Sequence, residues 1–183
     1  MPSWSRIARR ARVPLGFALA VLYLWLAQPT WASIAAGTAI ALLGLGLRAA
    51  ASGHITKDSA LTTSGPYAYT RNPLYLGSVL MAAGFAVAAL SWWIALAMLA
   101  MFLLIYLPVV REEEAYLQSH FPEFAEYARQ VPRFLPRLSP LPQAAPVAFS
   151  RERYLRHREY NAGVGAAAML AALVAKLLWL AHR

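Results

Sequence analysis

Residues 73–110 read PLYLGSVLMAAGFAVAALSWWIALAMLAMFLLIYLPVV, and this stretch decides the fold. It holds no Asp, Glu, Lys, Arg or His, and Ser91 divides it into two apolar halves. Each half approaches the roughly 20 apolar residues that an α-helix needs to cross a bilayer. Because Trp92 and Trp93 follow Ser91 directly, the stretch predicts a helical hairpin whose tight turn lies at a membrane interface.

Further apolar runs on both sides extend this pattern, and they cover residues 13–27, 31–51 and 162–181. The chain is 60% hydrophobic and only 14% charged, so it is more apolar than a soluble domain. We therefore predict an all-α, polytopic membrane helical bundle of about five transmembrane helices, whose cytoplasmic connecting helices form a pocket. Pro108 is expected to kink the end of the fourth helix.

The polar segments divide the chain into three predicted parts. Residues 1–51 are expected to form an N-terminal two-span hairpin. Residues 52–140 would form a core that combines a polar loop, a two-span hairpin and a Glu-rich cytoplasmic helix. Residues 141–183 would form a basic interfacial segment followed by a C-terminal span.

The distribution of charge predicts the orientation. The net charge is +9, and almost all of the 17 Lys and Arg residues lie before the first run, after the second or after the fourth. Cytoplasmic loops carry such an excess, so we expect an integral protein of the bacterial inner membrane with a cytoplasmic N-terminus and site. Five tryptophans then fall at the opposite interface, namely Trp25, Trp31, Trp92, Trp93 and Trp179.

The basic residues also indicate the partners. Anionic lipid headgroups suit them, whereas nucleic acid does not, because no basic run is interleaved with a stacking platform. Lys176 lies inside the last apolar run but near its outer end, where its side chain could reach the interface. The chain has no Cys, and its histidines lack metal-ligand spacing, so we expect no metal site.

The polar stretch before residue 73 contains a Gly65-Pro66 turn and ends at Asn72, where the third apolar run begins. A helix N-terminus that faces the cytoplasm offers unpaired N–H groups and a positive dipole end, which suit a carboxylate or phosphate. The alternative is an ordinary helix start, with Asn72 as the N-cap and Pro73 at the first helical position.

The polar stretch after residue 110 begins with three adjacent carboxylates at residues 112–114. They could bind a cation or ribose hydroxyls, or they could form a solvated helix end. Pro122 should divide the helix that follows. Arg129 and Arg133 could hold an anion, and lipid headgroups are the alternative partner of each.

Taken together, these pieces resemble the integral membrane methyltransferases that include isoprenylcysteine carboxyl methyltransferase and phospholipid methyltransferase. The resemblance covers roughly residues 47–136. It is carried by LTTSGPYAYTRNPLYLG at 61–77, the hydrophobic hairpin, Glu112 to Glu114, and then Leu117, Phe121, Tyr127, Val131, Pro132 and Pro136.

The resemblance implies S-adenosylmethionine as the cofactor, bound at the cytoplasmic face between the two polar stretches. Carried over to this chain, the cofactor-binding candidates are His54, Leu61, Gly65, Tyr67, Arg71, Asn72, Tyr75, Glu112 and Glu113. Arg71 and the helix start suit the cofactor's carboxylate, while Glu112 or Glu113 suits its ammonium or ribose. The resemblance also implies a lipophilic or lipid acceptor that enters from the bilayer, with Arg129 or Arg133 as the catalytic candidates that orient an acidic acceptor.

Two departures from the family pattern bear on the acceptor. Asn72 stands where many members have His, and the phospholipid-type members tolerate Asn there. Gln130 stands where carboxyl-methylating members often have Arg. The favoured prediction is an isoprenylcysteine-type carboxyl O-methyltransferase. The alternatives are a phospholipid N-methyltransferase, a membrane NADPH oxidoreductase like the sterol reductases, and a non-enzymatic membrane scaffold.

Overall fold

The fold was analysed in a computed structural model that describes residues 4–55, 60–142 and 148–182. The regular structure of the described residues is all helical, and no strand occurs among them. Its elements are α1 (Trp4–Leu26), α2 (Trp31–His54), η1 (Gly65–Ala68), α3 (Pro73–Ala89), α4 (Trp92–Met101), η2 (Phe102–Tyr106), α5 (Leu107–His120), α6 (Phe124–Gln130), α7 (Arg151–Arg156) and α8 (Tyr160–Ala181). The all-α class is therefore confirmed.

Long apolar helices dominate the molecule. Three are long and apolar enough to cross a membrane, namely Trp31–His54, Trp92–His120 and Tyr160–Ala181. Two shorter apolar helices, Val13–Leu26 and Pro73–Ala89, lie where the other spans were predicted. The chain is an integral membrane protein, and the count of five spans stays a prediction.

Small residues hold α2 and α3 together in the most extensive helix contact of the described bundle. A Cβ on Gly44 would lie 2.5 Å from the carbonyl oxygen of Gly77, and one on Gly84 would lie 2.5 Å from that of Gly37. Such close backbone approach is how helices pack in lipid, where apolar side chains gain little by leaving the bilayer.

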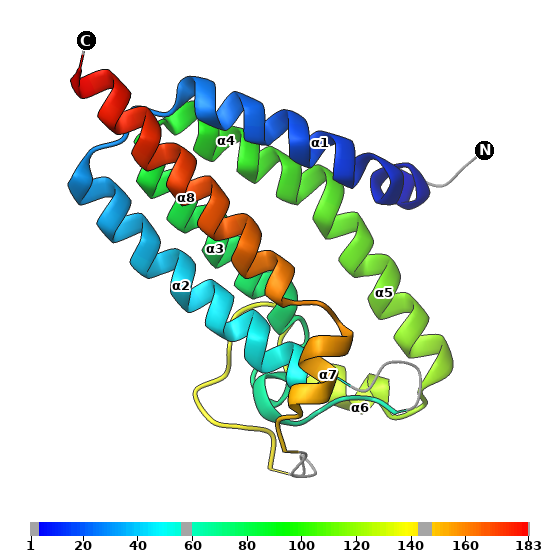
Figure 1. Cartoon of the computed structure of the whole chain (residues 1–183). Coiled ribbons are helices and arrows are strands. Elements are labelled where there is room, and N and C mark those ends of the chain that lie inside the picture. The colour runs from blue at the N-terminus through cyan, green and yellow to red at the C-terminus, as the bar shows by residue number, and fades with distance from the viewer. Residues whose placement is uncertain (1–3, 56–59, 143–147, 183) are drawn as a thin grey trace.

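The fourth predicted span continues beyond the membrane stretch. Figure 1 shows α4, η2 and α5 as one long helix that bends and then descends to the polar end of the molecule. The predicted distortion at Pro108 is the π-helical stretch η2 just before it, where Leu107 donates its N–H to Phe102, five residues back. This long helix carries the Glu-rich segment from the membrane into the polar end.

The two ends of the bundle differ in chemistry. The turns between α1 and α2 and between α3 and α4 lie at the end where the chain terminates, whereas α6 and α7 lie at the opposite end (Figure 1). The five tryptophans of the predicted aromatic belt are each more than half exposed. Lys176 lies at the end of the bundle where α1 ends. Its Nζ donates to the carbonyls of Leu24 and Trp25, at 2.7 and 3.0 Å, so it caps α1.

Candidate cofactor and acceptor site

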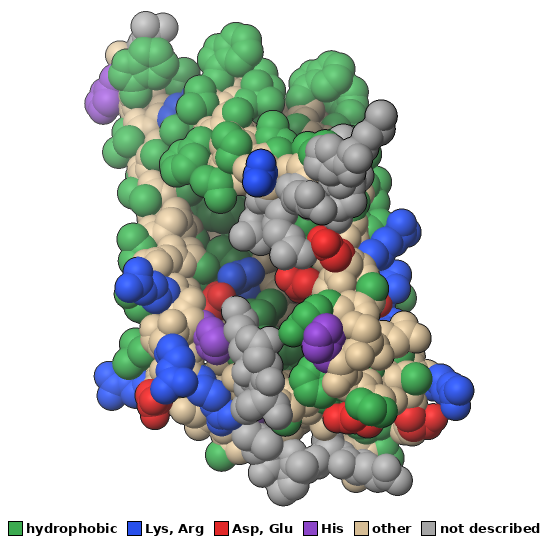
Figure 2. All heavy atoms as spheres, turned by 90° about the vertical axis from the view of Figure 1, so that its right-hand side faces the viewer, with side chains coloured by type: hydrophobic (Ala, Val, Ile, Leu, Met, Phe, Trp, Pro, Cys, Tyr) green, Lys and Arg blue, Asp and Glu red, His purple; other side chains and the backbone are tan. Residues whose placement is uncertain are grey.

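A polar cavity of about 620 Å³ lies at the polar end of the bundle. Figure 2 shows a hollow on this face, with acidic and basic side chains inside it. Of the predicted cofactor residues, the cavity lining includes Leu61, Tyr67, Arg71, Asn72, Tyr75 and Glu113. The two polar stretches that the sequence separates by a hairpin are therefore neighbours in space.

Glu114 is the buried centre of this arrangement, with only 6% of its surface exposed. Its Oε1 accepts a 2.8 Å hydrogen bond from Asn72 Nδ2, and its Oε2 accepts bonds from Arg133 Nε and Nη2, at 2.9 and 2.7 Å. Arg71 Nε lies 3.7 Å from Oε1. A buried carboxylate needs such partners, so Glu114 fixes the start of α3 against α5 and the segment after α6.

Glu114 was predicted only as part of the run of three carboxylates and not as a cofactor-binding residue, although a signal for its own role exists. It lies four residues after Val110 and three before Leu117, which places all three on one face of α5. Val110 is fully buried, and Leu117 packs against the cluster of Phe124, Tyr127 and Val131. A carboxylate on a buried helix face indicates a partnered role, unlike its neighbour Glu113 on the exposed side.

Backbone pairing locks the loop before α3 in place. Arg71 N–H donates to the Pro132 carbonyl at 2.9 Å, and Arg137 N–H donates to that of Tyr69 at 2.9 Å. Tyr127 Oη donates to the Tyr67 carbonyl at 2.7 Å. The rigid segment that follows α6 therefore supports the loop from which Tyr67 and Arg71 enter the cavity.

Among the described residues, Tyr67 Oη is a buried polar atom without a hydrogen-bond partner, and Tyr67 lines the cavity. Arg71 Nε makes no hydrogen bond there either, but it lies 3.7 Å from Glu114 Oε1 in an ion pair. Buried polar groups normally have partners, so unpaired ones that line a cavity indicate a ligand. Burial raises the pKa of Tyr67 well above the ordinary tyrosine value, and nearby Tyr127 raises it further. Its hydroxyl therefore stays protonated and can donate to an acceptor atom in the cavity.

Tyr75 stands at the membrane side of the cavity. Its hydroxyl donates to Glu113 Oε1 at 3.0 Å, and its ring meets that of Tyr106 edge-on, with centroids 6.3 Å apart. Both rings also line a second cavity of about 740 Å³, formed mainly by apolar residues of α1, α3 and α4. The two cavities share the residues Arg48, Tyr75, Ser78 and Tyr106, so they meet there.

His54 and Gly65 contact each other at the loop that precedes α3, outside the lining of the cavity. Gly65 has φ +57°, and a Cβ there would lie 2.5 Å from His54 Cδ2. His54 Nδ1 is 2.7 Å from the carbonyl of Ala50. The structure thus brings these two predicted residues together, as a contact that only glycine permits at position 65.

The remaining predicted residues lie elsewhere. Glu112 is on α5 but does not belong to the described lining of the cavity. Arg129 and Arg133 line a separate hollow of about 430 Å³ on the other side of Glu114, together with Arg71 and Arg111. Arg129 is largely exposed and pairs with Glu126 at 3.1 Å.

The described architecture is that of an integral membrane helical protein with a polar cavity at one end and an apolar cavity beside it. The phospholipid methyltransferase family model matches residues 12–123, and the chain belongs to that family. Members generally use S-adenosylmethionine, and the Tyr67 hydroxyl, which has no partner among the described residues, fits such a cofactor together with the Arg71 guanidinium. Among the described residues, no three His, Cys, Asp or Glu side chains gather as a metal site would require.

Two curated relatives match part of the chain. The cobalt-zinc-cadmium resistance protein CzcN of Cupriavidus metallidurans is 45% identical over 83 residues, which are 45% of this chain and 38% of CzcN. The nickel-cobalt-cadmium resistance protein NccN of Alcaligenes xylosoxydans xylosoxydans is 40% identical over 83 residues, 45% of this chain and 39% of NccN. The match thus spans less than two fifths of either relative's length, and no solved structure matches the chain.

Proposed function

We propose that this protein is an S-adenosylmethionine-dependent methyltransferase that acts on a lipophilic acceptor delivered by the bilayer. One observation carries the proposal. A polar cavity lined by the Tyr67 side chain, whose hydroxyl has no partner among the described residues, meets an apolar cavity among the membrane helices, and Tyr75 and Tyr106 line both. A polar cofactor and an apolar substrate need such adjoining compartments.

The cavity residues have distinct roles in this proposal. Arg71 and the N-terminus of α3 bind the carboxylate of the cofactor, while Glu113 accepts hydrogen bonds from its ammonium or ribose. Tyr67 donates its unpaired hydroxyl. The rings of Tyr75 and Tyr106 border the region where the cofactor's sulfonium would lie, since aromatic faces attract cations.

The protein contributes positioning and exclusion of water. When bound, S-adenosylmethionine would supply an activated methyl group: a bond forms from the acceptor's nucleophile to the methyl carbon as the carbon–sulfur bond breaks, and S-adenosylhomocysteine is the leaving group. The walls of both cavities hold the two reactants in line, which converts a bimolecular encounter into a unimolecular one. The apolar lining keeps water away from the reacting atoms.

Two acceptor classes are proposed. The sequence resemblance favours carboxyl O-methylation of an isoprenylcysteine-type acceptor. Arg129 and Arg133, its candidates for orienting the carboxylate, line the hollow beyond Glu114 and not the junction of the two cavities. The family model that matches describes phospholipid methyltransferases, which favours a phospholipid amine as the second candidate. We place the cavity on the cytoplasmic side of the bacterial inner membrane, because the basic residues concentrate at that end.

Calorimetric titration of the purified protein tests this proposal. S-adenosylhomocysteine should bind, and NADPH should not. Glu113→Ala and Tyr75→Ala should each abolish or strongly weaken binding, because they remove cavity groups. Glu126→Ala removes an exposed carboxylate of α6 and should leave binding unchanged.

Each other outcome points to a different function. Binding of NADPH alone would support a reductase, and binding of neither ligand would support a scaffold. Unimpaired binding of S-adenosylhomocysteine in both cavity variants would overturn the site assignment.

A further inference from the structure

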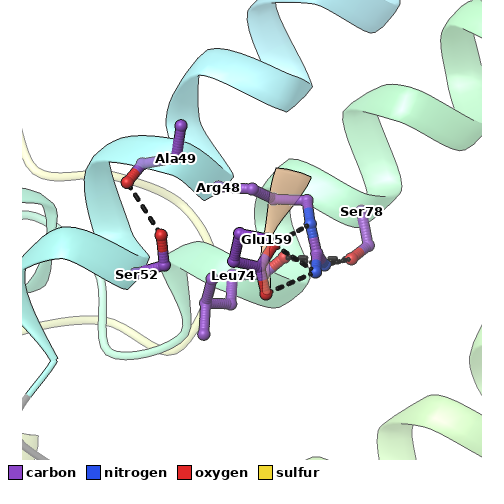
Figure 3. Close-up of polar contacts among 6 residues, drawn as sticks. All are labelled: Arg48, Ala49, Ser52, Leu74, Ser78 and Glu159. Atoms are coloured by element: carbon purple, nitrogen blue, oxygen red, sulfur yellow. Dashed lines mark hydrogen bonds and ion pairs between the residues drawn. The ribbon is translucent and has the colours of Figure 1, made fainter. Parts of the chain in front are cut away.

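Arg48 and Glu159 form an ion pair that joins α2 to the start of α8. Glu159 Oε2 accepts from Arg48 Nη2 at 2.7 Å and from Nε at 3.1 Å, and Oε1 accepts from Nη2 at 3.0 Å (Figure 3). Only 22% and 14% of the two side chains are exposed. Bidentate contact of a guanidinium with a carboxylate fixes both direction and distance.

The Nη1 group of the same guanidinium contacts α3. Arg48 Nη1 donates to the Leu74 carbonyl at 3.3 Å and to Ser78 Oγ, which itself donates to Leu74 at 3.0 Å (Figure 3). Every nitrogen of Arg48 is therefore engaged within the protein. Arg48 thus connects three helices, and it is not available to bind an anionic ligand.

This connection lies where the two cavities meet. Leu74 and Ser78 flank Tyr75 on α3, and Arg48, Tyr75, Ser78 and Tyr106 line both cavities. The beginning of α8 lies there too, because Glu159 lines the polar cavity and Ala162 lines the apolar one. Glu159 and Ala162 both lie beyond residue 123, where the match to the family model ends.

We infer that Arg48 and Glu159 are a positioning pair that sets the width of the opening between the two cavities. The pair holds the start of α8 at a fixed distance from Tyr75, so the C-terminal helix completes the route by which an acceptor meets the cofactor. This inference rests on the proposed function for the identity of the two ligands, whereas the geometry of the opening can be tested without either.

Reaction of an introduced cysteine measures the opening directly, because the chain has no Cys of its own. Val79 lines the apolar cavity next to Ser78, so Val79→Cys reports on reagents that arrive through the opening. The protein is placed in lipid nanodiscs and treated with a trimethylammonium methanethiosulfonate, whose fixed charge keeps it out of lipid. Glu159→Gln and Arg48→Gln should each accelerate this labelling about fivefold or more.

The pair of variants separates geometry from simple electrostatics. Glu159→Gln removes a negative charge and Arg48→Gln removes a positive one, so attraction of the cationic reagent alone would shift the two rates in opposite directions. Acceleration in both variants supports the inference. Opposite shifts, or rates equal to that of the parent, would overturn it.

Matched controls exclude general loosening. Glu152→Gln breaks an exposed ion pair with Arg156 on α7 and should not change the rate. A second reporter, Ile94→Cys on α4, is fully buried and lines neither cavity, so it should label equally in parent and variants. Equal acceleration at both reporters would show unfolding of the bundle and would count against the inference.

Two further measurements keep the test informative. If either Gln variant fails to fold, Arg48→Lys replaces it. Lysine keeps the charge but lacks the planar guanidinium that contacts α3 and Glu159 at the same time. Affinity for S-adenosylhomocysteine is titrated on the same samples as a separate readout of the proposed function. Lack of that binding in the parent protein would refute the proposed function, while the labelling result would still decide the role of the pair.

Discussion

At the scale of single residues, the hydroxyl of Tyr67 is the sharpest indicator of a ligand. It is buried, its residue lines the polar cavity, and it has no hydrogen-bond partner in the part of the chain that the structure describes. Tyr67→Phe should weaken S-adenosylhomocysteine binding by about 1 kcal/mol, roughly fivefold, because a neutral hydrogen bond is lost. It should not lower the thermal midpoint of the ligand-free protein, since no internal bond is broken.

The same residue makes a prediction about pH. Burial raises the pKa of Tyr67 above its ordinary value, so the neutral, donating form persists past the pH at which free tyrosine ionises. Its contribution to binding should therefore be constant between about pH 6 and pH 9. Calorimetry of the parent and of Tyr67→Phe across this range gives the contribution as a difference. A difference that disappears below pH 9 would contradict this role.

Glu114 should determine stability more than any exposed carboxylate does. Glu114→Ala leaves Arg133 and Asn72 without their shared partner and should cost about 3 kcal/mol of stability, as breaking a buried pair does. Glu126→Ala is the control, because its pair with Arg129 is exposed and is worth less than about 1 kcal/mol. Equal thermal midpoints for the two variants would argue against Glu114 as the structural centre.

The sequence could predict part of the site at this scale. Tyr67, Asn72 and Glu113 belong to short segments whose turn and cap signals place them at a helix start or a membrane edge. Arg48 and Glu159 were not predicted as site residues, because they lie 111 positions apart and come together only through helix packing. Such a contact leaves no local signal in one sequence.

At the scale of helices, the contact between α2 and α3 depends on glycine. Gly44→Ala would place a methyl group 2.5 Å from the Gly77 carbonyl and should destabilise the bundle by about 1–3 kcal/mol through overpacking. Gly46→Ala lies on the same helix with open space around it, so it should be neutral or slightly stabilising. Thermal unfolding in detergent compares the two. Similar losses in both variants would show that the close approach is unimportant.

Helix positions followed from the apolar runs, whereas helix ends did not. Apolar composition marks where a helix contacts lipid, and it does not mark where hydrogen bonding stops. The first helix therefore already includes Trp4, ahead of the apolar run that starts at Val13. The Arg and Ala residues between these two positions are strong helix formers. The fourth continues to His120, well beyond Val110, where the uncharged apolar run ends.

At the scale of the whole molecule, the orientation in the membrane is testable. The distribution of Lys and Arg predicts that the turn at Leu90 faces the periplasm and that α5 faces the cytoplasm. In the cysteine-free chain, an impermeant thiol reagent applied to spheroplasts should label Leu90→Cys and spare Gln118→Cys. Both should react after lysis, which is the control. The reverse pattern would overturn the orientation.

The whole architecture was largely predictable, because a bilayer permits few structures other than apolar helices. The meeting of a polar cavity with an apolar one was not, since it depends on how the helices tilt and bend. The π-helical stretch η2 and the turn before α8 both shape that junction. Neither has a sequence signature as strong as an apolar run.

Transfer of radioactive methyl groups tests the central claim most directly. Membranes that contain the protein are incubated with S-[methyl-³H]adenosylmethionine and extracted with organic solvent. We predict tritium in the lipid extract above that of membranes without the protein, and a loss of at least about tenfold in Glu113→Ala, which alters the cofactor cavity. Extracts equal to background, or equal labelling by the parent protein and Glu113→Ala, would contradict the proposed methyltransferase and its site.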